Sequence, residues 1–197
     1  MKGREYVLLL NEKGEFIGTE EKYDVHTTHT PLHQAFSCWL FNSEGQVLIT
    51  RRSLGKKAWP GVWTNSVCGH PQLNESFEQA ITRRCHFEVG AEITDITPVY
   101  PEFRYCATDT SGIMENEICP VYAAKLTNTI TPNPDEVMDC YWVSLDALYQ
   151  TLITSPRVFS PWMVLQFGSE KTRKRLMSFV KSVSYTHLRA HETDQYL

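Results

Sequence analysis

A helix that ends on glycine, preceded by a short extended segment, constrains the fold of this chain more than any other feature. The segment reads Cys68-Gly69-His70-Pro71, and from Ser76 to Val89 apolar residues recur at the spacing of one helix face. Asn74 or Ser76 can cap the start of this helix, and Gly90 can take the left-handed conformation that ends it. The sequence therefore predicts a loop, a helix over 76–89 and a turn.

The same stretch is similar to the Nudix box, a loop–helix–turn motif that holds divalent metal against a diphosphate. The box is written G-x5-E-x7-R-E-U-x-E-E-x-G-U, where U is a bulky aliphatic residue. The matching positions are Gly69, Glu75, Arg83, Glu88 and Gly90, and the departures are Arg84, Cys85, Phe87 and Ala91. Two metal-binding carboxylates of the hydrolase pattern are replaced by Arg84 and Phe87. We therefore expect diphosphate binding without hydrolysis.

An altered box of this kind is typical of type I isopentenyl-diphosphate delta-isomerases, which the chain resembles over residues 3–182. Several separated strings carry the resemblance: Leu32-His33, Ala35-Phe36-Ser37, Thr50-Arg51-Arg52, Lys57-Ala58-Trp59-Pro60-Gly61-Val62-Trp63-Thr64-Asn65-Ser66, Glu115-Asn116-Glu117 and Phe159-Ser160-Pro161-Trp162-Met163. The resemblance implies a Nudix-type α/β/α sandwich with a mixed β-sheet. It also implies an isomerase that interconverts isopentenyl and dimethylallyl diphosphate and supplies isoprenoid biosynthesis.

Length and composition indicate one compact domain, over residues 1–182. The chain has 197 residues, of which 42% are hydrophobic and 21% charged, enough for one core and too few for two ordinary domains. A net charge of −4 argues against a nucleic-acid surface, and no apolar run reaches the length of a membrane span. Six cysteines without a C-x-x-C pair indicate reduced thiols, so we expect a cytoplasmic protein.

Hydrophobic periodicity and turn residues predict the remaining elements. Strands are expected over 6–10, 16–19, 35–41, 47–51, 98–105, 118–125 and 140–143, and helices over 145–151 and 161–180, the last in one or two pieces. Residues 183–197 lack a sustained apolar face and lie beyond the resemblance. We expect this tail to be disordered or an artefact of cloning or sequencing.

Histidines and glutamates form a candidate metal site. His26, His33, His70, Glu115 and Glu117 offer nitrogen and oxygen ligands that suit Mn²⁺, Zn²⁺ or Fe²⁺. Taken singly, each has the ordinary alternative of a solvated surface residue. The resemblance implies that the five bind one ion, Mn²⁺ or Zn²⁺, whereas the other histidines of the chain match nothing in the family.

Isomerising an unactivated alkene requires a proton added at one carbon and another removed elsewhere, through a species close to a tertiary carbocation. The site needs an acid, a base and a group that stabilises positive charge without reacting with it. The resemblance implies Cys68 and Glu117 as the acid–base pair, Tyr105 as an aid to Glu117, and Trp162 as the ring that faces the cation. The alternative for Cys68 and Trp162 is ordinary core packing.

A diphosphate needs cations to enter a dry pocket. The resemblance implies that Lys22, Arg52, Lys56 and Arg84 contact it, and that Mg²⁺ bound by Glu88 and the Cys68 backbone accompanies it. For other basic residues, namely Arg51, Lys57 and Arg83, solvated charges are an equal alternative. Cys106 occupies a position where members of the family often have arginine. This departure concerns the loop after Tyr105 and not the metal ligands.

Two further functions stay open from the sequence. One is a Nudix hydrolase that cleaves a nucleoside or other organic diphosphate, which would release phosphate or a nucleotide. The other is a noncatalytic module that binds metal and phosphate, for which a thiol and a carboxylate facing an apolar ligand would serve no purpose. For the isomerase we expect a small-molecule partner, isopentenyl diphosphate, and no binding to nucleic acid or to a membrane. We expect the chain to be a monomer or a weak homodimer.

Overall fold

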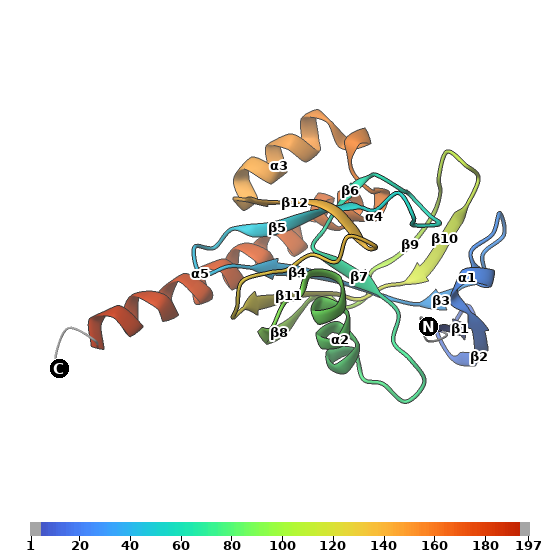
Figure 1. The fold of residues 1–197 in the computed structure, drawn as a ribbon, viewed down its shortest axis with the longest axis horizontal. Coiled ribbons are helices and arrows are strands. Elements are labelled where there is room, and N and C mark those ends of the chain that lie inside the picture. Colours follow the sequence, from blue (N-terminus) through green and yellow to red (C-terminus); the bar gives the residue numbers. More distant parts are fainter. Residues whose placement is uncertain (1–4, 194–197) are drawn as a thin grey trace.

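Two β-sheets and the helices that flank them build this protein, as shown by a computed structural model that describes residues 5–193, with side chains through residue 183 (Figure 1). The smaller sheet has the strand order β2-β1-β3-β10-β9. Its strands are β1 Tyr6–Leu10, β2 Phe16–Glu21, β3 His33–Gln34, β9 Arg104–Thr108 and β10 Met114–Ile118. All of its pairs are antiparallel except β3 with β10.

The larger sheet forms the centre of the domain. Its main path is β12-β5-β4-β11-β8, with β6 attached to β5 and β7 attached to β4. The strands are β4 Phe36–Phe41, β5 Val47–Arg52, β6 Trp63–Thr64, β7 Val67–Gly69, β8 Ile93–Tyr100, β11 Val121–Leu126 and β12 Val137–Val143. Since β4 and β11 are parallel while the other pairs are antiparallel, the sheet is mixed.

Helices cover both faces of the larger sheet. They are α2 Phe77–Val89, α3 Leu145–Thr154, α4 Pro161–Gly168 and α5 Glu170–Thr193, with a 3₁₀ turn over Pro156–Val158. The short helix α1 Lys22–Val25 lies instead beside β1 and β2 of the smaller sheet. Alternate residues of β4 enter two separate cores because successive side chains point to opposite faces. Phe36 and Leu40 pack with α2, whereas Trp39 and Phe41 pack with α3, α4 and α5. The predicted α/β/α sandwich is confirmed.

The helix of the altered box, α2, begins and ends as predicted. Ser76 caps it by accepting a hydrogen bond from the backbone of Gln79, whose side chain bonds back to Ser76. Gly90 ends it with φ of 62°. The predicted strands over 6–10, 16–19, 35–41, 47–51 and 140–143 and the helix over 145–151 are also confirmed, with ends shifted by a few residues.

Two predicted strands are wrong because each joins pieces of different sheets. The stretch 98–105 divides into β8, which ends at Tyr100, and β9, which begins at Arg104. The stretch 118–125 divides in the same way between β10 and β11. Pro101 and Pro120 lie at the two breaks, where a residue without a backbone N–H can leave one sheet and enter the next. The sheets therefore meet along these crossings.

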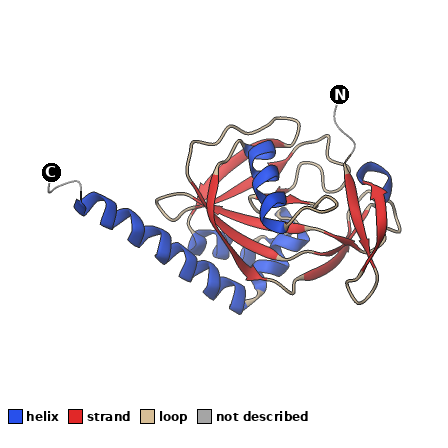
Figure 2. Cartoon of the chain, turned by 90° about the horizontal axis from the view of Figure 1, so that it is seen from below, coloured by secondary structure: helices blue, strands red, loops and turns tan. Residues whose placement is uncertain are grey.

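The C-terminal helix continues past the expected domain end. Figure 2 shows α5 extending away from the body of the molecule. Val183, one residue beyond the predicted boundary at 182, is 4% exposed and belongs to the apolar core. The side chains of the tail after Val183 lie outside the described residues, so the expectation for 184–197 stays a prediction. None of the described helices is long and apolar enough to cross a bilayer.

Candidate active site

A cavity of about 440 Å³ opens where the two sheets meet. The described residues that line it include every predicted site residue except His33: Lys22, His26, Arg52, Lys56, Cys68, His70, Arg84, Glu88, Tyr105, Glu115, Glu117 and Trp162. His33 lies beneath the cavity wall with 0% exposure. Residues far apart in the sequence thus meet in one place.

Strand register explains much of this convergence. In the smaller sheet Glu117 is paired with His33 on one side and with Tyr105 on the other. In the larger sheet Cys68 is paired with Ser37. Glu115 and Glu117 are both buried, as expected for alternate residues of β10 that share one face.

The predicted metal ligands form a buried cluster. His26, His33, His70 and Glu117 each offer a ligand atom, and these atoms lie within 4.8 Å of one another. Glu115 Oε2 lies 3.0 Å from His26 Nε2 and 3.8 Å from His33 Nε2. The five residues that the sequence singled out are therefore close enough to share one divalent ion.

The unpaired atoms of this cluster fit a metal. Backbone carbonyls of Lys22 and Pro31 lie 2.8 Å from His26 Nδ1 and 2.9 Å from His33 Nδ1. A carbonyl only accepts hydrogen bonds, so each Nδ1 carries the proton and each Nε2 keeps a lone pair. Both Nε2 atoms and Glu115 Oε2 are buried without a hydrogen-bond partner. Buried lone pairs that converge in this way fit a divalent cation.

Charge in the cluster is distributed unevenly. Burial raises the pKa of Glu117, but the nearby imidazole of His33 and the hydrogen bond from His70 lower it by more, so this carboxyl stays ionised. Burial lowers the pKa of His70 to about 3, which keeps its imidazole neutral. For His33, burial lowers the pKa, while the charges of Glu117 and Glu115 raise it above the ordinary value.

Cys68 is the middle residue of β7 and lines the cavity wall. Burial raises the pKa of its thiol to about 12, so the sulfur carries a proton at neutral pH. Its Sγ is 3.2 Å from Asn65 Oδ1 and 3.3 Å from Ser37 Oγ. The cavity thus holds a protonated thiol and, on the other sheet, an ionised carboxylate.

Aromatic rings form another part of the wall. The ring of Trp162 lies 5.7 Å from that of Tyr105 and 5.3 Å from that of Trp59, the second in an edge-to-face arrangement. The guanidinium carbon of Arg52 lies 5.4 Å from the centre of the Trp162 ring, at a distance typical of a cation–π contact. Hydrogen bonds to the carbonyls of Ala58 and Trp59 fix Arg52 there. Trp162 can therefore face a positive charge.

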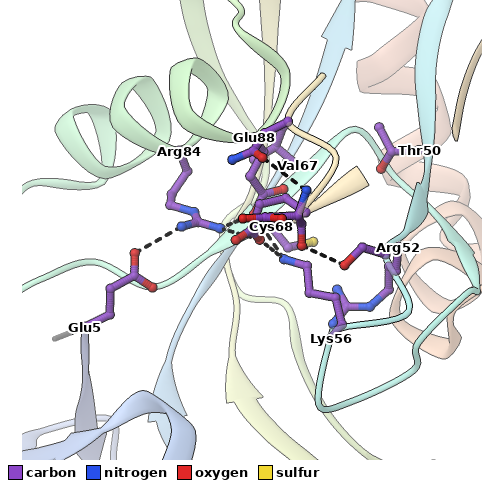
Figure 3. A network of polar contacts seen from close by, with 12 residues as sticks. Glu5, Thr50, Arg52, Lys56, Val67, Cys68, Arg84 and Glu88 are labelled. Atoms are coloured by element: carbon purple, nitrogen blue, oxygen red, sulfur yellow. Dashed lines mark hydrogen bonds and ion pairs between the residues drawn. The ribbon is translucent and has the colours of Figure 1, made fainter. Parts of the chain in front are cut away.

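Basic residues and carboxylates form a network at the wall beside α2 (Figure 3). Arg84 pairs with Glu88, and it contacts Glu136 at 3.3 Å and Glu5 at 3.1 Å. Lys56 also pairs with Glu136 and lies 3.6 Å from Glu88. Burial raises the pKa of Glu88, but Lys56 and Arg84 lower it to about 2. The carboxylates hold these cations where a diphosphate could contact them.

Gly69 brings this network close to β7. A Cβ added there would lie 2.8 Å from Arg84 Cγ and 3.0 Å from Phe36 Cζ. Only glycine lets α2 and its buried arginine approach the strand so closely. Arg83, the neighbouring arginine of the box, donates two hydrogen bonds to Glu75, of 2.7 and 2.8 Å. This pair stabilises the loop and helix of the box.

Sequence reasoning missed several polar residues of the site, two of them buried. Ser37 and Asn65 contact the thiol, and Glu5 and Glu136 contact the basic residues. In the sequence, Ser37 and Asn65 stood out only because they belong to the strings that resemble the isomerase family. Glu5 and Glu136 carried no signal, because their partners are far away in the sequence.

Comparisons with known proteins agree with this geometry. A model of the NUDIX domain matches residues 31–163. The isopentenyl-diphosphate Delta-isomerase of Salmonella typhi is 60% identical over 175 residues, 89% of this chain and 97% of that protein. The protein of the same name from Klebsiella pneumoniae (strain 342) is 60% identical over 176 residues, 89% of this chain and 96% of that protein.

Two solved structures share the fold. A Deinococcus radiodurans protein gives a TM-score of 0.59 at 24% identity, over 77% of this chain and 90% of that one. A MutT protein from Methanosarcina mazei Go1 gives 0.54 at 18% identity, over 75% of this chain and 94% of that one. The predicted family resemblance is confirmed: the chain has a NUDIX domain and belongs to the isopentenyl-diphosphate Delta-isomerase family.

Proposed function

We propose that this protein interconverts isopentenyl diphosphate and dimethylallyl diphosphate, with Cys68 and Glu117 moving the protons. The observation that carries the proposal is one cavity lined by a protonated thiol, an ionised carboxylate, aromatic rings and a basic network. Each of these four features meets one requirement of alkene isomerisation. The names of the relatives described above point to the same reaction.

Protonation states favour Cys68 as the acid and Glu117 as the base when isopentenyl diphosphate is the substrate. Cys68 gives its proton to the terminal alkene carbon, so an S–H bond breaks and a C–H bond forms. Glu117 then takes a proton from the carbon nearer the diphosphate, and the electrons of that C–H bond form the new double bond. One proton is added and one removed, and the roles reverse in the opposite direction.

Stabilisation of the cation falls to the rings. Trp162 and Tyr105 line the cavity with ring faces that attract positive charge. Burial raises the pKa of the Tyr105 hydroxyl well above its ordinary value, so its oxygen stays neutral and is only a weak nucleophile toward the cation. Both rings are buried, which keeps bulk water away from the reacting carbons. Tyr105 is paired with Glu117 across the sheet, which supports its role as an aid to that base.

Diphosphate binding is assigned to Lys22, Arg52, Lys56 and Arg84. In the structure their charges are largely paired with carboxylates or carbonyls, and an incoming diphosphate would replace some of these partners. Glu88 and the Cys68 backbone would hold the Mg²⁺ that accompanies the substrate. Mg²⁺ in that position would neutralise diphosphate charge.

The histidine–glutamate cluster would hold Mn²⁺ or Zn²⁺. Mixed nitrogen and carboxylate ligands suit these ions better than Mg²⁺, which prefers oxygen. Such an ion would keep Glu117 ionised and fixed in place. Incubation with each metal after chelation tests the assignment, and we expect Mn²⁺ or Zn²⁺ to bind the wild type tightly and His33→Ala weakly.

The reaction itself is tested with purified protein, isopentenyl diphosphate, Mg²⁺ and either Mn²⁺ or Zn²⁺ in deuterated water. We expect deuterium-labelled dimethylallyl diphosphate, followed by nuclear magnetic resonance, without release of phosphate. Phosphate release would instead support a Nudix hydrolase, which the loss of two box carboxylates disfavours. Binding of metal and substrate with neither product would support the noncatalytic module.

We also propose a cytoplasmic protein that is a monomer or weak homodimer. Six free cysteines support a reducing compartment. Sedimentation at several protein concentrations tests the assembly, and a tight oligomer would contradict it.

A further inference from the structure

A chain of buried hydrogen bonds ends at the Cys68 thiol from two directions. Its links are Trp39 Nε1 to Gln166 Oε1 (3.1 Å), Gln166 Nε2 to Ser37 Oγ (2.8 Å), Ser37 Oγ to Cys68 Sγ (3.3 Å), Cys68 Sγ to Asn65 Oδ1 (3.2 Å) and Trp162 Nε1 to Asn65 Oδ1 (3.0 Å). Ser37, Asn65 and Gln166 are all 0% exposed. A hydroxyl and two amides thus connect the proposed acid to two indoles.

The tryptophan at one end fixes the orientation of Gln166. An indole N–H can donate a hydrogen bond but cannot accept one, so the atom that faces Trp39 Nε1 is the carbonyl oxygen of Gln166. The amide nitrogen of Gln166 then faces Ser37 and donates to its Oγ. One lone pair of the Ser37 hydroxyl is therefore occupied.

The tryptophan at the other end fixes Asn65 in the same way. Trp162 Nε1 can only donate, so Asn65 presents Oδ1 to it and to Cys68. The amide nitrogen of Asn65 bonds instead to the carbonyls of Cys38 and Val67. Because Oδ1 only accepts, the Cys68 thiol donates its own proton to Asn65.

These two constraints decide the direction of the contact between Ser37 and Cys68. The thiol proton points to Asn65, so the sulfur can only accept from Ser37. The hydroxyl of Ser37 already accepts from Gln166, and its proton is free to point at Cys68 Sγ. Cys119 Sγ, 3.5 Å from Ser37 Oγ, can supply the second donor to this oxygen. Every donor and acceptor of the hydroxyl is then satisfied.

We propose that Ser37 is a positioning residue for Cys68, held as a hydrogen-bond donor to its sulfur by Gln166. This inference rests on the proposed isomerisation. When the thiol gives its proton to the alkene, the electron pair of the S–H bond stays on sulfur. The hydrogen bond from Ser37 then becomes charge-assisted and stronger than in the resting enzyme. An interaction that strengthens only during proton transfer raises kcat and leaves KM unchanged.

Substitution of Ser37 tests the proposal, with wild-type turnover measured first. Ser37→Ala removes one buried oxygen, and we expect kcat to fall about 10- to 100-fold at an unchanged KM. Ser37→Thr, which keeps the hydroxyl, should recover most of this loss. Cys38→Ala removes a buried sulfur from the next residue of β4, whose side chain enters the core beside α2, so it serves as the matched control and should stay within about twofold of wild type.

A second readout separates this role from simple packing. The S–H stretching band of Cys68, isolated as the infrared difference from Cys68→Ala, should shift in Ser37→Ala and not in Cys38→Ala. A wild-type kcat in folded Ser37→Ala, an unshifted band, or a loss that appears only in KM would overturn the proposal. If the wild type itself does not isomerise, the proposed function fails instead.

Discussion

At the scale of single residues, burial raises the pKa of both groups that would move protons, yet their protonation states at neutral pH are opposite. Cys68 has no cationic partner strong enough to offset its desolvation, so its thiol keeps its proton. Glu117 is equally buried, but His33 and His70 face it and hold it ionised. The same environment therefore yields an acid on one sheet and a base on the other.

Substitution of either group should remove nearly all isomerisation. We expect Cys68→Ala and Glu117→Gln each to lower kcat about 10²- to 10⁴-fold, because a positioned acid or base typically contributes that much. Turnover of isopentenyl diphosphate measures the effect. Circular dichroism confirms that each variant is folded, and substantial activity in a well-folded variant would contradict the assignment.

At the scale of elements, the site depends on loops and turns held by single contacts. Asp109, in the turn between β9 and β10, accepts hydrogen bonds from Ser111 and Ile113 through Oδ1 and from the backbone N–H of Trp59 through Oδ2. Trp59 has φ of 46°, a conformation that its own side chain disfavours. The carboxylate thus connects the β9–β10 turn to the loop whose tryptophan packs on Trp162.

The Asp109 contact predicts a pH effect on stability. Burial raises the pKa of Asp109, but its hydrogen bonds lower it below the ordinary value, so its contribution is present above about pH 4 and is lost as pH falls through the lowered pKa. In Asp109→Asn, one amide N–H would face the Trp59 N–H. We expect the variant to lose about 1–3 kcal/mol of folding stability at neutral pH. When the pH falls from about 5 to about 3, the variant should lose less further stability than the wild type, because it has no carboxylate to protonate there. Urea unfolding across this range measures both.

Gly69 predicts a packing effect between β7 and α2. An alanine there must displace Arg84 Cγ or the buried ring of Phe36, so we expect a loss of about 1–3 kcal/mol. Because Arg84 is a proposed diphosphate contact, KM for the substrate should also rise. Gly168→Ala is the matched control, since nothing lies within 4 Å of its added Cβ, and it should lose neither stability nor affinity. Equal behaviour of the two variants would rule out the steric argument.

Sequence patterns predicted elements well where one residue periodicity runs through one element. The helix over 76–89 had a cap, an apolar face and a terminal glycine, and all three act as expected. The strands of two or three residues, β3, β6 and β7, were missed because no period can be read from so short a run. The crossings at Pro101 and Pro120 were missed because apolar alternation continues from one sheet into the next.

At the scale of the whole molecule, the same limit applies to the site. Residue types and family strings pointed to the metal and proton-transfer residues, and these residues lie together in the structure. The carboxylates that balance the basic network could not be found, since Glu5 and Glu136 reach it only through the tertiary fold. Residues that meet only in the folded chain can be identified only from its structure.

The end of the domain gives the last prediction. Val183 packs with the core beside Phe179, whereas the expectation from the sequence placed the boundary before it. A chain that ends after Val183 should keep the melting temperature and turnover of the full chain, because no packed side chain described in the structure is removed. A chain that ends after Lys181 should lose about 1–2 kcal/mol with Val183, which lowers the melting temperature by about 2–8 °C. Thermal unfolding of the two shortened chains and the full chain decides the boundary. Equal melting temperatures of the two shortened chains would place the boundary before Val183. A lower melting temperature of the chain ending after Val183 than of the full chain would show that residues 184–197 contribute to the fold.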